Sequence, residues 1–232
     1  MPLNTPIVHV SDPVLLVGGG KHRKRGLAAC AGRYGALVAA DSGADWLLGQ
    51  GLMPDKVIGD LDSVSPEALT TLGLERVVRV KEQSSTDFEK CLTRIEAPLV
   101  LGVGFLGGRL DHELAALHTL VSYPERRCVL IGGQDIVFLA PPKLALDLAA
   151  GTRVSLFPFG AVTARATGLQ WPLEGLHFDP ARLIGTSNTA LGPVQLEVDA
   201  PDMLVILPRS LLPRCLAALA GDGVGWPARS PR

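Results

Sequence analysis

Residues 14–20 read Val-Leu-Leu-Val-Gly-Gly-Gly, a short apolar run that ends in three glycines. A continuous apolar run of this length is typical of a strand buried on both faces. Similar runs alternate with helical patterns up to about residue 140, which predicts an α/β domain with a mostly parallel sheet and flanking helices. The predicted strands are Val14–Val17, Ala36–Ala40, Lys56–Ile58, Arg76–Val80, Leu99–Val103, Arg127–Ile131 and Ile136–Leu139.

Glycine or aspartate follows most of these predicted strands. Open α/β sheets bind their ligands at the carboxyl ends of the strands, and glycines there let the backbone approach a ligand closely. The pattern therefore indicates a binding site along this edge of the sheet. It involves residues 18–20, 41–43, 59–60, 104 and 132–133.

The alternation stops at residues 140–143, Ala-Pro-Pro-Lys, and turn-rich, strand-like sequence follows with no long helix before Ser210–Ala220. This change predicts an α/β domain over 1–142 and a smaller all-β sandwich domain over 143–232. Residues 221–232 resemble a loose tail. The predicted strands of the second domain are Arg153–Phe157, Val162–Ala166, Val194–Val198 and Met203–Leu207.

Composition excludes several classes of protein. The 232 residues include 22 Lys and Arg against 23 Asp and Glu, and 47% are hydrophobic, which indicates a globular chain with no general attraction to nucleic acid or anionic membranes. The one dense basic stretch, residues 21–25, is short. No apolar run is long enough for a membrane helix, and Met1–Ser11 lacks a signal-peptide pattern, so we expect a cytoplasmic protein. The cysteines, which we expect to be buried thiols, are Cys30, Cys91, Cys128 and Cys215.

Residues 59–63, Gly-Asp-Leu-Asp-Ser, follow a predicted strand and precede Ser65-Pro66, an N-cap serine with proline at the first helical position. In an extended chain, Asp60 and Asp62 would lie on the same side, where their repulsion is unfavourable unless a cation lies between them. Oxygen ligands of this kind suit Mg²⁺. A polar loop with an N-cap carboxylate is the alternative interpretation of this short motif.

A second acidic segment follows at residues 83–89. Thr86 and Glu89 have the spacing of a capping box, which places Asp87 in the first turn of a helix. Asp87 alone would simply complement the helix dipole. Because carboxylates also follow the strands before Asp41 and Asp60, their gathering along one sheet edge predicts a bound cation.

Residues 104–112, Gly-Phe-Leu-Gly-Gly-Arg-Leu-Asp-His, lie between a predicted strand and helix. Glycines, helix amides and the planar Arg109 guanidinium suit a phosphate group. The alternative is a glycine-rich turn with Asp111 as N-cap. His112 and His118 fit the helix surface or packing better than catalysis, and the sequence has neither a P-loop nor a G-x-S-x-G motif.

Taken in order, these segments resemble the thiamine pyrophosphokinase family over nearly the whole chain. Residues 54–63 match the family pattern P-D-x-x-I-G-D-x-D-S at every specified position, and G-G-R-L-D-H and G-T-S-N are intact at 107–112 and 185–188. Residues 14–20, 40–45, 86–92 and 168–173 are similar to further family segments. Two departures are Ser42 and Asp45, which replace a glycine and an asparagine and add a charge near the expected nucleotide pocket.

The resemblance implies transfer of a pyrophosphoryl group from ATP to thiamine, giving thiamine diphosphate and AMP. It also implies an ATP- and Mg²⁺-binding α/β domain, a thiamine-binding β-sandwich domain, and a homodimer with thiamine between the subunits. Neither nucleic acid nor membrane is an expected partner. Rival interpretations are a pyrophosphokinase for another alcohol, such as a hydroxymethylpterin, and a non-catalytic thiamine or nucleotide sensor.

The resemblance assigns roles to individual residues. The Mg²⁺ ligands would be Asp60, Asp62 and Asp87. The phosphate and hydroxyethyl end would be lined by Asp41, Gln83, Thr86, Lys90, Arg109 and Asp111, and the ATP site would include Gly19, Gly20 and Gly108. Ser187 and Asn188 would bond the aminopyrimidine, with Trp171 as an aromatic wall or, alternatively, a packed core residue. Three groups are candidates for the general base that accepts the hydroxyl proton: Asp111, Asp41 and a phosphate oxygen.

Overall fold

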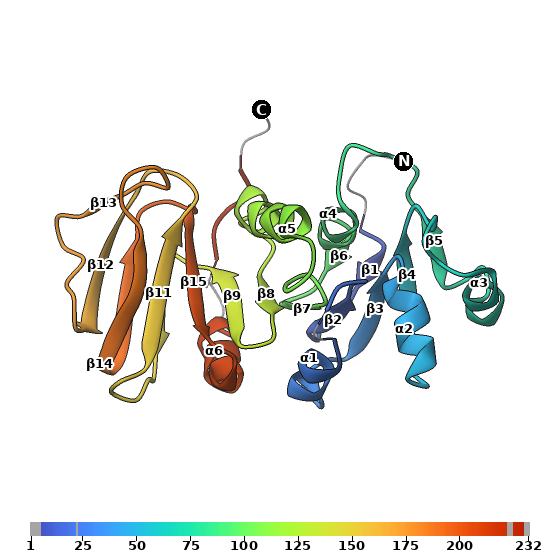
Figure 1. Cartoon of the computed structure of the whole chain (residues 1–232), viewed down its shortest axis with the longest axis horizontal. Coiled ribbons are helices and arrows are strands. Elements are labelled where there is room, and N and C mark those ends of the chain that lie inside the picture. Colours follow the sequence, from blue (N-terminus) through green and yellow to red (C-terminus); the bar gives the residue numbers. More distant parts are fainter. Residues whose placement is uncertain (1–5, 22, 222–224, 230–232) are drawn as a thin grey trace. The chain divides into compact units, whose positions relative to one another are not determined.

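The structure is a computed structural model that describes residues 6–21, 23–221 and 225–229. The chain is an α/β protein (Figure 1). It forms two compact units, which we describe separately. The first contains the chain up to Thr119 together with Cys128–Gly133, and the second contains Leu120–Arg127 and the chain from Gln134 onward. The units thus divide after Gly133, before the boundary expected at 142/143.

The first unit is built on a parallel sheet, as the alternating apolar runs predict. Its strand order is β8-β7-β2-β3-β4-β5, and every neighbouring pair in it is parallel. β2, β3, β7 and β8 are buried along their whole length. The strands are β2 (Val14–Val17), β3 (Ala36–Ala40), β4 (Lys56–Gly59), β5 (Val77–Arg79), β7 (Val100–Val103) and β8 (Cys128–Ile131).

The strand order reverses between β2 and β7. From β2 the chain adds β3, β4 and β5 on one side, and then returns to add β7 and β8 on the other. At this switch point the turns after β2 and β7 are bonded together, because Gly18 N donates to Val103 O at 2.8 Å and Gly20 N donates to Gly104 O at 2.9 Å. Open α/β sheets bind ligands in the crevice at such a point.

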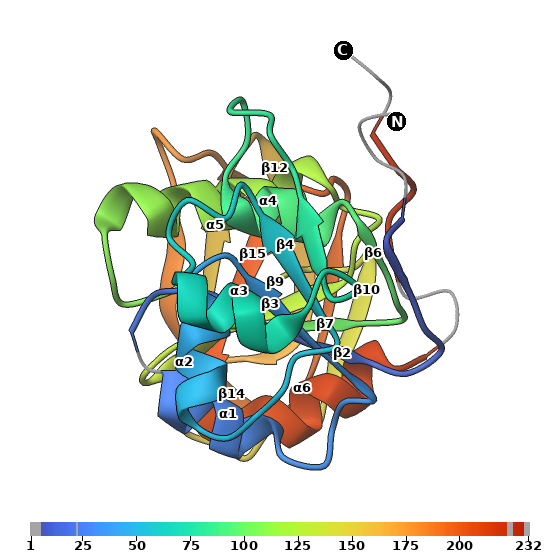
Figure 2. The same cartoon turned by 90° about the vertical axis from the view of Figure 1, so that its right-hand side faces the viewer.

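Helices connect these strands. α1 and α2 lie on the opposite side of the sheet from α4 (Figures 1 and 2). Two N-caps confirm the sequence prediction: Ser65 Oγ accepts a hydrogen bond from Ala68 N at 3.1 Å, and Thr86 Oγ1 accepts one from Glu89 N at 3.3 Å. The helices are α1 (Arg23–Cys30), α2 (Gly43–Gly49), α3 (Pro66–Leu72), α4 (Asp87–Leu92) and α5 (Leu110–Ser122), the last of which ends in the second unit.

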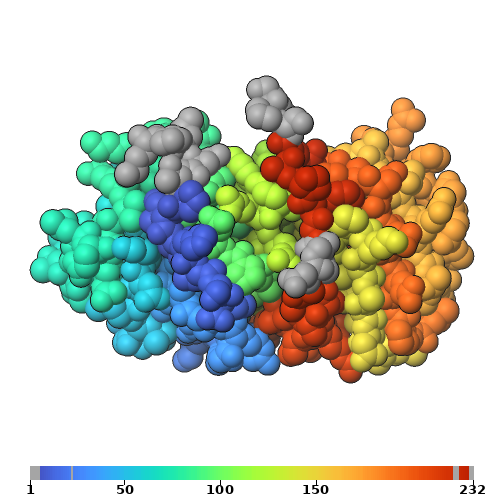
Figure 3. All heavy atoms as spheres, turned by 180° about the vertical axis from the view of Figure 1, so that it is seen from behind, coloured from blue at the N-terminus to red at the C-terminus, as the bar shows by residue number. Residues whose placement is uncertain are grey.

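A small surface pair of strands completes the first unit. β1 (Val8–His9) runs parallel to β6 (Ile95–Glu96), and both have only two residues. Figure 3 shows the chain after residue 5 running over the surface of this unit. Strands this short carry no usable periodicity, so the sequence did not predict them.

The second unit is antiparallel, as its turn-rich sequence predicts. Its strands follow the order β13-β12-β14-β11-β15-β9, and β10 pairs with β14 beside this path. The elements are β9 (Asp135–Leu139), β10 (Lys143–Leu146), β11 (Arg153–Pro158), β12 (Val162–Leu169), β13 (His177–Phe178), β14 (Gly185–Val198), β15 (Met203–Pro208), η1 (Arg209–Leu211) and α6 (Leu212–Leu219).

One predicted strand has an antiparallel partner. The alternation groups Ile136–Leu139 with the parallel sheet, but β9 pairs antiparallel with β15, with Val205 opposite Phe138. The strand itself is predicted correctly, and its antiparallel partner is the part that the sequence did not specify. An apolar run specifies that a strand is buried, whereas its partner is decided by contacts with residues far along the chain.

β14 is longer than the predicted strand Val194–Val198. Its first part pairs with β11 and its second part with β10 and β12. β12 passes close to it at Gly168, where φ is +81° and an added Cβ would lie 2.1 Å from Pro193 O. Gly192 and Pro193 interrupt the strand pattern in the sequence, which explains the shorter prediction.

The expectation of a loose C-terminal tail is wrong for the residues that the structure describes there. Trp226 Nε1 donates to Ala140 O at 2.7 Å, and Arg229 Nε donates to Val121 O at 3.0 Å. Figure 3 shows this segment lying on the surface of the second unit. Residues 222–224 and 230–232, and His22 of the basic stretch, lie outside the described residues.

Two further predictions concern burial. All four cysteines are buried and free, as expected, and burial raises the pKa of the Cys30 thiol to about 12. Across the described ranges, no helix combines the length and the apolar character that crossing a bilayer requires.

Candidate functional site

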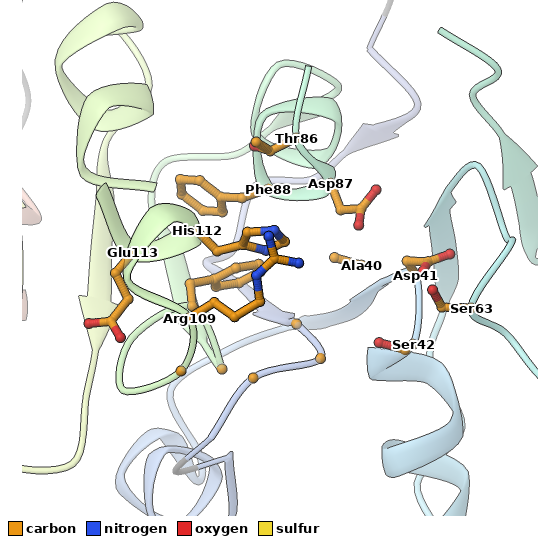
Figure 4. Close-up of a pocket in the computed structure, with 16 residues that line it drawn as sticks. Ala40, Asp41, Ser42, Ser63, Thr86, Asp87, Phe88, Arg109, His112 and Glu113 are labelled. Atoms are coloured by element: carbon orange, nitrogen blue, oxygen red, sulfur yellow. The ribbon is translucent and has the colours of Figure 1, made fainter. Parts of the chain in front are cut away.

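A pocket of about 350 Å³ lies in the first unit, at the carboxyl ends of the sheet strands. It contains the turns after β2 and β7 and the start of α4 (Figure 4). Seven of the predicted site residues line it together: Gly19, Gly20, Asp41, Thr86, Asp87, Gly108 and Arg109.

The glycines on one side of this pocket are required by close contacts. A Cβ added to Gly18 would lie 2.5 Å from the Phe105 ring, and one added to Gly20 would lie 2.3 Å from Gly104 O. Larger residues would therefore push apart the bonded turns after β2 and β7. The bare backbone at these positions leaves room for a ligand to approach.

Asp41 lies on the opposite side of the pocket, in a strained and buried position. Its φ is +46°, which is uncommon for a residue other than glycine, and it is 4% exposed. Among the described residues, its Oδ1 is a buried side-chain oxygen without a hydrogen-bond partner. Burial raises the pKa of Asp41, and the charges of Asp87 and Asp60 raise it further, against hydrogen bonds from Ser63 and Ser42.

Lys90 joins two of the predicted carboxylates. Its buried Nζ lies 3.0 Å from Asp60 Oδ2 and 3.3 Å from Asp87 Oδ1. Burial acts to lower the pKa of Lys90, but the hydrogen bond to Asp60 and the charge of Asp87 outweigh it, so the pKa is raised. The hydrogen bond from Lys90 in turn lowers the pKa of Asp60, which also accepts from Gln83. We call Asp41, Asp60 and Asp87 the carboxylate cluster.

Among the described residues, the side chains of Asp60 and Asp62 pair with different cations, contrary to the extended D-x-D geometry expected from the sequence, although Arg79 Nε also donates to the backbone O of Asp60 at 3.1 Å. Leu61 has a φ of +68°, so the segment turns instead of extending. Asp62 N donates to Asp60 Oδ1 at 3.3 Å, while Asp62 Oδ1 lies 3.5 Å from Arg79 Nη2. Both of these paired side chains are largely exposed. A positive φ at a leucine could not be foreseen from residue type.

Arg109 and Asp111 form an exposed ion pair at the start of α5. Arg109 Nη2 donates to Asp111 Oδ2 at 2.6 Å, and His112 N donates to Asp111 Oδ1 at 2.9 Å. The hydrogen bond from Arg109 lowers the pKa of Asp111. Asp111 is thus bonded to the arginine and is not the N-cap, because α5 already begins at Leu110.

Several pocket residues were not predicted from the sequence. Phe88 and Phe105 pack with ring centroids 4.6 Å apart. Phe88 directly follows Asp87, and Phe105 directly follows Gly104. Their positions in these two motifs could therefore have identified them as pocket residues. His112, which the sequence assigns to the helix surface or to packing, is exposed on α5 and also lines the pocket. The remaining unpredicted residues are Ala40, Ser63 and Glu113.

The second unit has a smaller and mostly apolar pocket of about 180 Å³ that contains Trp171 and Asn188. Trp171 is 53% exposed, so it is not the packed core residue of the alternative interpretation. Leu176, Leu183 and Ile184 are other exposed apolar residues of this pocket.

Asn188 is buried and its carboxamide is bonded to backbone. Nδ2 donates to Trp171 O at 2.8 Å, and Oδ1 accepts from Trp171 N at 3.2 Å and from Thr189 N at 2.8 Å. Ser187 is exposed, has a φ of +64° and donates its N–H to Ser155 Oγ at 3.0 Å. Ser187 is next to the pocket residue Asn188 but is not among the lining residues.

The donor set in the first unit fits a hard divalent cation. The cluster offers carboxylate oxygens only, as Mg²⁺ prefers, and Asp41 contributes a buried oxygen that has no hydrogen-bond partner in the residues that the structure describes. Within the described part of the chain, no three His, Cys, Asp or Glu side chains are already arranged around a common metal position. Asp60 and Asp87 are instead bonded to Lys90.

The environment of Asp41 predicts a gain in stability from Asp41→Asn. The raised pKa means that the charged form weakens the folded state at neutral pH, and asparagine tolerates a positive φ better than most residues. We expect the free energy of unfolding to rise by about 1 kcal/mol at pH 7 without metal. The gain should shrink as the pH falls and Asp41 becomes protonated. Urea unfolding of the wild type and of Asp41→Asn, at pH 7 and at an acidic pH, measures this difference. A lower free energy of unfolding for the variant at pH 7 would contradict the prediction.

Protein-family comparison matches both halves of the chain. The family model described as "Thiamin pyrophosphokinase, catalytic domain" matches residues 31–131. The model described as "Thiamin pyrophosphokinase, vitamin B1 binding domain" matches residues 143–202.

Curated relatives are similar over part of their length. Thiamine pyrophosphokinase 3 of Oryza sativa subsp. japonica is 32% identical over 154 residues, which cover 58% of this chain and 58% of that protein. Thiamine pyrophosphokinase 1 of Arabidopsis thaliana is also 32% identical over 154 residues, with the same 58% of each chain. The chain therefore spans less than two thirds of the length of these relatives.

Solved structures share the fold. Yeast thiamin pyrophosphokinase superposes with a TM-score of 0.72 at 18% identity, covering 90% of each chain. Thiamin pyrophosphokinase from Geobacillus thermodenitrificans has a TM-score of 0.70 at 24% identity, covering 84% of this chain and 96% of the other. At these identities the similarity establishes the fold.

Proposed function

This chain belongs to the thiamine pyrophosphokinase family, and we propose that it transfers a pyrophosphoryl group from ATP to the hydroxyl group of thiamine. The products would be thiamine diphosphate and AMP. The observation that carries the proposal is the pocket of the first unit, where bare glycine backbone and Arg109 face Asp41 and Asp87 (Figure 4). This arrangement suits an anionic polyphosphate accompanied by a cation.

The reaction needs positioning and charge neutralisation more than covalent chemistry. The thiamine hydroxyl oxygen would bond to the β-phosphorus of ATP, and the bond from that phosphorus to the oxygen bridging the α-phosphorus would break. Arg109, which is 70% exposed, would bind phosphate oxygens with its planar guanidinium. Lys90, whose side chain is buried, would hold Asp60 and Asp87 in place. The proton acceptor is left open between Asp41, Asp111 and a phosphate oxygen.

Mg²⁺ is the cofactor that we propose. Asp60, Asp62 and Asp87 would hold it, and the unpartnered oxygen of Asp41 supports a cation at this side of the pocket. When bound, the ion would offset the charge that develops on the transferred phosphate oxygens. Asp62 is exposed, and within the described part of the chain its side chain is paired with Arg79, an exposed contact that a bound cation could replace.

The second unit would supply the thiamine contacts. The exposed Trp171 indole would give the cationic thiazolium an aromatic wall, and Ser187 would offer its exposed hydroxyl to the aminopyrimidine. The carboxamide of Asn188 is largely used to hold the backbone of Trp171. Asn188 would therefore act partly through Trp171 as a positioning residue.

Asn188→Ala should raise the KM for thiamine about ten-fold, because loss of the carboxamide frees the turn that carries Trp171. The KM for ATP should stay unchanged. Asn188→Asp, which keeps the two acceptor bonds and loses the donor, should give an intermediate value. Steady-state kinetics with each substrate varied measures this, with Gln195→Ala on the exposed side of β14 as control. Equal rises in both KM values would argue against the role in positioning Trp171.

The activity is tested directly by incubating the protein with ATP, Mg²⁺ and thiamine and resolving both products. Equal amounts of AMP and thiamine diphosphate are expected. ADP with thiamine monophosphate would mean a simple kinase. Thiamine binding without turnover would favour the sensor interpretation. Turnover with a hydroxymethylpterin but not with thiamine would favour a pyrophosphokinase for that other alcohol.

Three finer features also stay proposals. We infer that the second unit is a β-sandwich, which is supported by the pairing of β14 with β11 along one part and with β10 and β12 along the other. Homodimer assembly and a cytoplasmic location follow only from the sequence and the family resemblance. Light scattering of the purified protein tests the dimer.

A further inference from the structure

Ser42 stands directly before α2, a position at which serine usually caps a helix through its side chain. Ser65 and Thr86 do so for α3 and α4, with extended backbone angles. Ser42 has a φ of −59° and a ψ of −7°, and among the described residues its side chain bonds none of the first amides of α2. Its hydroxyl group therefore has no role in holding the helix.

The hydroxyl group points into the pocket of the first unit instead. Ser42 lines that pocket, and Figure 4 shows its oxygen directed toward the turn that follows β2. A Cβ added to Gly19 would lie 2.2 Å from Ser42 Oγ, so this oxygen lies against the backbone of Gly19. The absence of a side chain at position 19 provides the space that the hydroxyl group occupies.

The backbone around Ser42 is fixed by close packing. A Cβ added to the next residue, Gly43, would lie 2.1 Å from Val17 O, so the start of α2 packs directly on the end of β2. Asp41, on the other side of Ser42, is buried. Ser42 Oγ is thus held between the glycine turn and the carboxylate cluster, on the same pocket as Arg109.

We propose that Ser42 is a ligand-binding residue that donates a hydrogen bond from Oγ to a phosphate oxygen of the bound nucleotide. The inference rests on the proposed function, because it takes the pocket to be the nucleotide site. A hydroxyl group beside bare backbone, in a pocket that also contains a guanidinium, matches the acceptor oxygens of a phosphate chain. It adds a neutral donor where Asp41 and Asp87 would repel an anion without its cation.

The test separates binding from helix capping. Isothermal titration would measure the binding of α,β-methylene-ATP, tripolyphosphate and adenosine, each with Mg²⁺, to the wild type, Ser42→Ala and Ser42→Gly. Both variants should bind the analogue and tripolyphosphate about ten-fold more weakly, as expected for one hydrogen bond to a charged group, and adenosine equally well. The melting temperature of Ser42→Ala should not change.

Ser65→Ala is the matched control, because Ser65 does cap its helix. It should lower the melting temperature by a few degrees, at about 1 kcal/mol for a lost cap. If Ser42→Ala also melts lower and binds tripolyphosphate normally, Ser42 is a cap in solution and the proposal is wrong. Weaker binding of adenosine alone, with unchanged affinity for tripolyphosphate, would also overturn the proposal.

Failure of the proposed function gives a different result. A wild-type protein that binds the analogue with Ser42-dependent affinity but forms no thiamine diphosphate would contradict only the proposed reaction. A wild-type protein that binds neither the analogue nor tripolyphosphate would overturn the role of Ser42.

Discussion

Lys90→Met should lower the free energy of unfolding by about 2 kcal/mol at pH 7 and abolish most activity. The substitution keeps the length of the side chain but leaves Asp60 and Asp87 without their shared cation, close to the buried Asp41. Removing one partner of a buried ion pair usually lowers the free energy of unfolding by more than this. Asp87 is 41% exposed, however, so water screens part of its charge. Urea unfolding and the product assay measure the two effects.

The pH dependence of this difference follows from the pKa of Asp60. Lys90 lowers that pKa, so the pair stabilises the fold above the ordinary aspartate range and loses its contribution as the pH falls. The stability gap between wild type and Lys90→Met should therefore be largest near neutral pH and narrow in acid. Lys56→Met is the control, since Lys56 Nζ donates an exposed hydrogen bond to the backbone O of Glu75 at 2.7 Å and is not part of the carboxylate cluster. A gap that widened in acid would rule out this ion pair as the cause.

Asp87→Asn should reduce turnover by about two to three orders of magnitude with little effect on stability. Asp87 lines the pocket at the first turn of α4, where its charge would hold the cation that accompanies ATP. The folded state loses a partly exposed bond to Lys90, but it also loses repulsion toward Asp41. These terms oppose each other, so we expect a change in unfolding free energy of under about 1 kcal/mol.

The measurement combines single-turnover kinetics, thermal unfolding and titration with Mg²⁺ in the absence of nucleotide. Weaker Mg²⁺ binding together with slow turnover would support the metal role. Asp147→Asn is the matched control, because Asp147 is exposed and its Oδ2 lies 3.6 Å from Arg214 in the second unit. Near-normal turnover in Asp87→Asn would remove this residue from the proposed mechanism.

Much of the first unit could be predicted because its signals are local. A run such as Val14–Val17 is apolar throughout because the strand is buried on both faces, and the cap bond of α3 joins Ser65 to Ala68, three residues further along the chain. The position of the pocket at the strand ends could be predicted for the same reason. Glycine and aspartate directly follow strands whose carboxyl ends meet at one edge.

Other features depend on residues that are distant in the sequence. The placement of Lys90 between Asp60 and Asp87 joins α4 to the end of β4. The bond between Asn188 and the backbone of Trp171 crosses from β14 to the turn after β12. Neither residue type nor spacing specifies such partners, since each follows from how the elements pack.

The sequence by itself determined the parallel strands, the helix caps, the buried cysteines and the edge of the sheet that carries the site, because periodicity and strand-end chemistry are properties of short segments. Only the tertiary structure decided that β9 pairs antiparallel with β15, that Leu61 turns Asp62 toward Arg79, and that the Ser42 hydroxyl faces Gly19. These outcomes depend on backbone angles and contacts set by the whole fold. The physical reason is that packing selects one partner among many that the local sequence allows.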